Sequence, residues 1–120
     1  MTFHGDYSAE AHAAAQGRAR AAGVFAEHAE VIVAALPDVP EGHVLVAVVD
    51  GSHEFTGTHH VARDEIAGRI PELEGEGGWA LVVSPGADLA EVRRRTDEMG
   101  TLARRRAEMI TRIVARRGAR

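Results

Sequence analysis

The feature that most constrains the fold is the apolar run from Val44 to Val49. Every position in it is apolar and four of the six are valine, which predicts a central strand buried on both faces of a sheet. Asp50-Gly51 follows directly and is typical of a two-residue hairpin turn. Residues 52–56 are therefore expected to return antiparallel, with Val48 opposite His53 and Val46 opposite Phe55.

The rest of the chain reads as helices around one more strand. Residues 8–36 favour a helix, with Asp6 or Ser8 as N-cap and Pro37 as its end. Gly23 is expected either to break this helix or, with its alanines, to let another helix approach closely. The remaining predicted elements are a short helix from Thr58 to Pro71, a strand from Trp79 to Ser84, and a helix from Asp88 to Arg116 that opens with a capping box of Asp88 and Glu91.

These elements predict an α+β fold, in the order α-β-β-α-β-α, within a single domain over residues 1–120. The expected sheet is small, three-stranded and mainly antiparallel, in the order 2-1-3, with long N- and C-terminal helices and one short middle helix. The predicted core consists of Phe25, Ile32, Val46, Val48, Phe55, Ile66, Leu81 and Val83.

The last helix carries an apolar seam whose members are spaced by three and four residues, the pattern of helices that pack along each other. At about 29 residues, or roughly 43 Å, this helix is longer than a three-stranded sheet can cover. Part of the seam therefore needs a partner, either the N-terminal helix of the same chain, as a projecting hairpin, or another subunit. The predicted interface consists of Leu89, Val92, Met99, Ala103, Ile110 and Ile113 on this helix with Phe25 and Ile32 on the first.

Composition excludes several chemistries. The chain has no cysteine, which excludes disulfides and thiolate sites, and no lysine, which excludes Schiff-base chemistry and a complete phosphate-loop motif. All 14 basic residues are arginine, and alanine and glycine are abundant, which is typical of a GC-rich bacterial or viral coding sequence. Residues 1–87 carry 13 acidic side chains and four arginines, whereas residues 88–120 carry five and ten. A basic segment on an acidic body favours contacts with its own body, a neighbouring subunit or a polyanion.

The arginines of the last helix have two interpretations. Arg94, Arg95, Arg104, Arg105, Arg112 and Arg116 are candidates for binding nucleic-acid phosphates. The preferred interpretation is a solvated face that pairs with itself at i, i+4, through Glu91–Arg95, Arg93–Asp97, Arg94–Glu98, Arg104–Glu108 and Glu108–Arg112.

A histidine cluster is the only candidate metal site. His53, His59, His60 and Asp64 supply zinc or iron ligand types, and a helix from Thr58 would place His60 and Asp64 on one face. The spacing matches no zinc motif, so exposed or half-buried histidines with no metal are the preferred interpretation. No catalytic set is recognisable, and no cofactor is expected.

The sequence therefore predicts a non-enzymatic structural module that homo-oligomerises, or docks with other subunits of a complex, through its long helices. Nucleic acid is the alternative partner, and a small metal-dependent enzyme or sensor is a third hypothesis. With no signal peptide and no apolar run long enough to span a bilayer, we expect no membrane partner and a location in the cytoplasm or in a virus particle.

Overall fold

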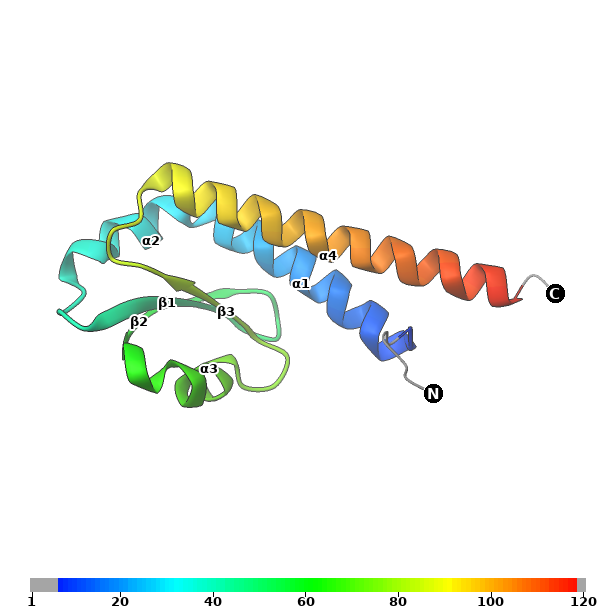
Figure 1. The fold of residues 1–120 in the computed structure, drawn as a ribbon, viewed down its shortest axis with the longest axis horizontal. Coiled ribbons are helices and arrows are strands. Elements are labelled where there is room, and N and C mark those ends of the chain that lie inside the picture. Colours follow the sequence, from blue (N-terminus) through cyan, green and yellow to red (C-terminus); the bar gives the residue numbers. More distant parts are fainter. Residues whose placement is uncertain (1–6, 119–120) are drawn as a thin grey trace.

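A computed structural model describes residues 7–118, so the possible N-cap at Asp6 lies outside the described residues. The elements follow the predicted α-β-β-α-β-α order and form an α+β fold (Figure 1). They are α1 (Ala9–Glu27), α2 (Ala29–Ala35), η1 (Leu36–Asp38), β1 (His43–Val49), β2 (Phe55–Ala62), η2 (Arg63–Glu65), α3 (Ile66–Glu74), β3 (Trp79–Val83) and α4 (Leu89–Gly118).

The sheet has the predicted order, β2-β1-β3, and both pairings are antiparallel. β1 is buried at every position after His43, which confirms a central strand covered on both faces. One face packs against α1, α2 and α4 through Leu45, Ala47, Val49, Leu81 and Val83. The other packs against α3 through Val44, Val46, Val48 and Val61, which lie beside Ile66, Ile70 and Leu73.

The predicted two-residue turn and its register are wrong. Residues 50–54 form a longer loop, in which Asp50 Oδ1 accepts hydrogen bonds from the backbone N–H groups of Ser52 and Glu54 at 2.9 and 3.0 Å. His53 turns the chain with a φ of 64°, and Val49 pairs with Phe55 and Val46 with His59. The side chain of Asp50 therefore organises the loop, because it satisfies two backbone donors that a tight turn would have left to water.

Gly51 is required here for close approach. A Cβ at this position would lie 2.8 Å from the carbonyl oxygen of Glu76, in the loop that precedes β3. The glycine thus lets two loops at the same end of the sheet touch, which is a tertiary requirement and not a turn preference.

Residues 58–62, predicted as the start of the short helix, belong to β2. The helix α3 begins later, at Ile66, and continues through Pro71 to Glu74, where Gly75 ends it with a φ of 58°. Proline removes only one backbone donor from this short helix, and the contacts of Ile70 and Leu73 with the sheet on either side of it keep the helix in place.

The first helix breaks at His28 and not at Gly23. His28 leaves the helical conformation, its Nδ1 donates to the Val24 carbonyl at 2.8 Å, and its ring stacks on Phe55 with the centroids 4.4 Å apart. The bend turns α2 along the sheet and keeps Ile32 buried. A Cβ at Gly23 would meet nothing within 4 Å, so this glycine has no packing role.

α1 and α4 pair along their length and project beyond the sheet as a helical hairpin (Figure 1). The molecule is correspondingly elongated, 57 Å by 28 Å by 25 Å. Small residues allow the close packing, since a Cβ on Gly100 would lie 3.4 Å from the Cβ of Ala22. Of the predicted core, only Phe55 and Ile66 are half-buried, and the other six residues are buried.

Candidate interaction surface

The seam predicted as an interface lies inside the single chain. Phe25, Ile32, Val92, Ala103 and Ile110 are buried, and Leu89, Met99 and Ile113 are half-buried. α1 covers the length of α4 that the sheet cannot reach, so the hairpin alternative holds within one chain. Phe25, Ile32, Leu89, Val92 and Met99 belong to the core between the helices and the sheet, so the seam is used within the chain and is not free for a partner.

The outer surface of α4 carries a second stripe that the sequence analysis missed. Leu102, Arg105, Met109, Arg112 and Arg116 follow one another at spacings of three and four residues and are all exposed. Leu102 is 64% exposed and Met109 37%. Because this spacing keeps side chains on one side of a helix, the five residues form a continuous surface, which we call the outer stripe.

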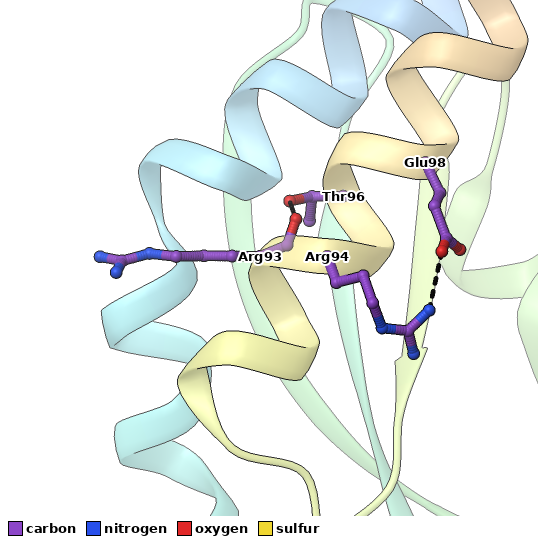
Figure 2. A network of polar contacts seen from close by, with 4 residues as sticks. All are labelled: Arg93, Arg94, Thr96 and Glu98. Carbon is purple, nitrogen blue, oxygen red and sulfur yellow. Dashed lines mark hydrogen bonds and ion pairs between the residues drawn. The ribbon is translucent and has the colours of Figure 1, made fainter.

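The predicted self-pairing of the arginines is mostly wrong. Of the five expected intrahelical pairs, only Arg94–Glu98 forms, with Nη1 and Oε1 2.7 Å apart (Figure 2). Arg93 points away from this pair (Figure 2), and its Nη2 lies 3.5 Å from Oε1 of Glu30 on α2.

Two other arginines of the nucleic-acid prediction are engaged elsewhere. Arg95 is half-buried and donates to the Val82 carbonyl on β3, while Arg104 donates to the Thr101 hydroxyl at 3.3 Å. Tertiary neighbours thus compete with i, i+4 pairs that are individually weak. Within residues 7–118, no acidic group lies within ion-pair distance of Arg105, Arg112 or Arg116.

The start of α1 is fixed against α4 by aromatic and polar contacts. The Tyr7 ring has the guanidinium of Arg106 at 5.4 Å and that of Arg117 at 5.7 Å from its centroid. His12 Nε2 lies 3.0 Å from the Thr111 hydroxyl oxygen. These contacts hold the two helices together at the end of the arm that is far from the sheet.

Charge is separated along the molecule. Residues 104–118, in the projecting half of α4, contain six arginines and one acidic residue, Glu108. Residues 38–76, which include β1, β2 and α3, contain nine acidic residues and two arginines. The arm is therefore basic and the sheet end acidic, as the sequence asymmetry indicated.

The predicted histidine cluster is not assembled. His59 and His60 are consecutive on β2 and point to opposite sides of the sheet, His53 lies in the loop before it, and Asp64 lies in η2. The expectation that His60 and Asp64 share a helix face is wrong, because His60 is in a strand. Among residues 7–118, no group of three or more histidine or acidic side chains is placed to hold a metal ion.

No family model matches the chain, and no curated protein or solved structure is significantly similar to it. No helix in the described part of the chain is long and apolar enough to cross a membrane.

Proposed function

We propose that this protein is a non-enzymatic assembly module that associates with copies of itself, or with other subunits of a complex, through the outer surface of its helical arm. The observation that supports this most directly is the outer stripe, which combines the exposed side chains of Leu102 and Met109 with three arginines. Arginine and methionine are enriched at protein interfaces, where an apolar contact is surrounded by charge.

The arm suits this role because its inner face is already packed. The contacts between α1 and α4, together with the arginines on Tyr7, hold the stripe on a rigid support. A preorganised surface loses little conformational entropy on binding.

Charge identifies the kind of partner. The stripe is basic and apolar, so it complements an acidic surface with exposed apolar groups. The acidic sheet end of a second copy supplies the complementary charge, and it is present at the same concentration as the arm.

Light-scattering mass on a sizing column, at low and moderate salt, tests the proposal. The variant Leu102→Ser/Met109→Ser is expected to lower the mass of the assembly, because it removes the apolar part of the stripe. Val31→Ser is the matched control, since Val31 is 54% exposed but lies on α2, away from the stripe. A stripe variant with the same mass as the control at every concentration would contradict the proposal.

Nucleic acid is the second candidate partner, and a specific observation favours it. Arg105, Arg112 and Arg116 lie on one side of α4 without acidic partners in the described chain, and the expected Glu108–Arg112 pair does not form there. Phosphate contacts by these side chains would make affinity fall steeply with salt.

Reversing the charge of these arginines distinguishes the two candidate partners. Arg105→Glu/Arg112→Glu/Arg116→Glu is expected to abolish binding to a nucleic-acid duplex if that is the ligand, whereas Leu102→Ser/Met109→Ser would leave it unchanged. Arg63→Glu, on the exposed η2 segment, is the control for a charge reversal outside the arm. Absence of binding by the native protein at low salt excludes the nucleic-acid candidate.

A further inference from the structure

The two edges of the sheet differ in how their backbone groups are satisfied. On β3, the Ala80 N–H donates to Glu74 Oε2 at 3.2 Å, and the Val82 carbonyl accepts from Arg95. Both groups face away from β1, so a further strand would have to displace these side chains. This edge is blocked.

The edge formed by β2 has no such cover. Antiparallel strands alternate between residues that bond one neighbour and residues that bond the other. The backbone groups of Ala80 and Val82 point away from β1. Val46 lies opposite Val82, so the backbone groups of Val46 point away from β3 and bond β2 instead. Val46 lies opposite His59, so the residues on either side of His59 direct their backbone groups outward.

These outward groups are those of Thr58 and His60. Within residues 7–118, no hydrogen bond reaches the backbone N–H or carbonyl that either residue directs away from β1. His59 and His60 are exposed, so solvent reaches this part of the strand.

The composition of β2 does not protect the edge. Natural edge strands discourage pairing with lysines, other charges or proline. The eight residues Phe55–Ala62 contain no arginine, acidic residue or proline, although charged residues are 27% of the chain. A bulge between Val48 and Val49 disturbs the pairing at the Phe55 end only.

We propose that a second copy of the chain pairs antiparallel with β2 through this edge, so that two three-stranded sheets form one continuous six-stranded sheet. A residue of β2 whose backbone groups point outward can form hydrogen bonds only with another such residue of the second copy. The twofold axis can therefore lie at only a few positions along the strand. A twofold axis at His59 pairs more residues of the regular part of β2 than an axis at any other allowed position. It sets His59 opposite its own copy, Thr58 opposite His60, and Gly57 opposite Val61.

A second copy fits because the strand is complementary to itself in this register. The strand contains no carboxylate or guanidinium, so pairing in this register brings no two acidic and no two arginine side chains together. Sheet pairing on this edge does not use the outer stripe of α4, so the helical arm stays available for the contact proposed above.

The test uses the full chain carrying Leu102→Ser/Met109→Ser, so that any contact through the arm is removed. At about pH 8, we expect a light-scattering mass of twice 12.8 kDa. His59→Glu and His59→Arg should each reduce it to that of the monomer, because like charges would then lie opposite each other at the axis. Mixing the two variants should restore the dimer, since a carboxylate from one copy would then face a guanidinium from the other.

A matched control and a second measurement make the result decisive. Ala67→Glu adds the same charge at an exposed position of α3, outside the paired strand, and should leave the dimer intact. Amide hydrogen exchange should show protection at Thr58 and His60 in the dimer and its loss in His59→Glu.

The outcomes distinguish this inference from the proposed function. If the native protein is an assembly and the stripe variant is a monomer, strand pairing is refuted, while assembly through the arm stands. A monomeric native protein would refute both. If the stripe variant keeps the native mass and His59→Glu lowers it, strand pairing stands and assembly through the arm is refuted. A dimer that persists in His59→Glu, or monomers that do not recombine when mixed, would also overturn the inference.

Discussion

Truncation of Ile110 measures how much the arm contributes to the stability of the fold. Ile110 of α4 is 1% exposed and lies beside Tyr7 and His12 at the start of α1, whereas its neighbour Met109 is 37% exposed on the outer stripe. Ile110→Ala removes about three buried carbon groups at ~0.8 kcal/mol each, and alanine returns about 0.4 kcal/mol of helix propensity. The substitution leaves no closed cavity, because Ile110 borders an open groove of about 450 Å³ with Tyr7 and Val114. The side chains around the groove can therefore relax into the space, and no cavity penalty is expected.

The expected loss is therefore about 2 kcal/mol. With an unfolding entropy of about 2.1 cal/mol/K per residue, a chain of this length should unfold ~8 °C lower. Met109→Ala, the matched control, should change the free energy of unfolding by less than about 0.5 kcal/mol.

Thermal and urea unfolding followed by helical circular dichroism would provide both numbers. The midpoint should not depend on protein concentration in a background without self-association, because α1 and α4 pair within one chain. Equal effects of the two substitutions would refute the packing of the arm, and a midpoint that rises with concentration in that background would indicate exchange of arms between protomers.

Three other substitutions test the sheet, its loops and the start of α4. Gly51→Ala should destabilise by about 1–3 kcal/mol in urea unfolding, because its Cβ would meet the Glu76 carbonyl oxygen at 2.8 Å; an unchanged midpoint would show that the loops do not touch. Val46→Thr should cost about 1–3 kcal/mol, since it places a hydroxyl where the side chain is fully buried, and a stable variant would contradict the predicted central strand. Asp88→Ala should cost about 1 kcal/mol and speed hydrogen exchange at the Glu91 amide, which donates to Asp88 Oδ1 at 2.8 Å; unaltered exchange there would rule out the cap.

The central strand and the starts of the two long helices were predictable because local chemistry determines them. An uninterrupted apolar run can be satisfied only by burial on both faces, and β1 is buried accordingly. Ser8 and Asp88 cap α1 and α4 with their own side chains, as the sequence indicated. These are interactions over a few residues, so the sequence alone contains them.

The hairpin and the short helix were not predictable by the same means. Asp50-Gly51 fits a tight turn, but the carboxylate of Asp50 organises a longer loop, and Gly51 serves a contact with a loop that follows α3. The change of register moved Thr58 and the histidines into β2, and with them the predicted metal cluster was lost. The longer loop after β1 therefore changed the predicted element of the residues between this loop and Ile66.

The arginines show the same limit at the candidate site. Spacing predicted five intrahelical pairs, but Arg93 and Arg95 have better partners on α2 and β3 that no spacing rule within one helix includes. The outer stripe could have been found in the sequence, since Leu102 and Met109 are seven residues apart. It was missed because the apolar seam on another side of the same helix is the stronger pattern.

The sequence by itself determined the order of the elements, the central strand, the starts of the two long helices and the separation of charge. The tertiary structure decided which helical face is core and which is surface, where the arginines bind, and which sheet edge stays open. The reason is physical: an apolar seam specifies that it must be covered but not by what, and a charged side chain forms its contacts with whichever group the fold brings near. Here α1 covers the seam, Arg95 and Glu74 close one edge, and β2 is left exposed at the other.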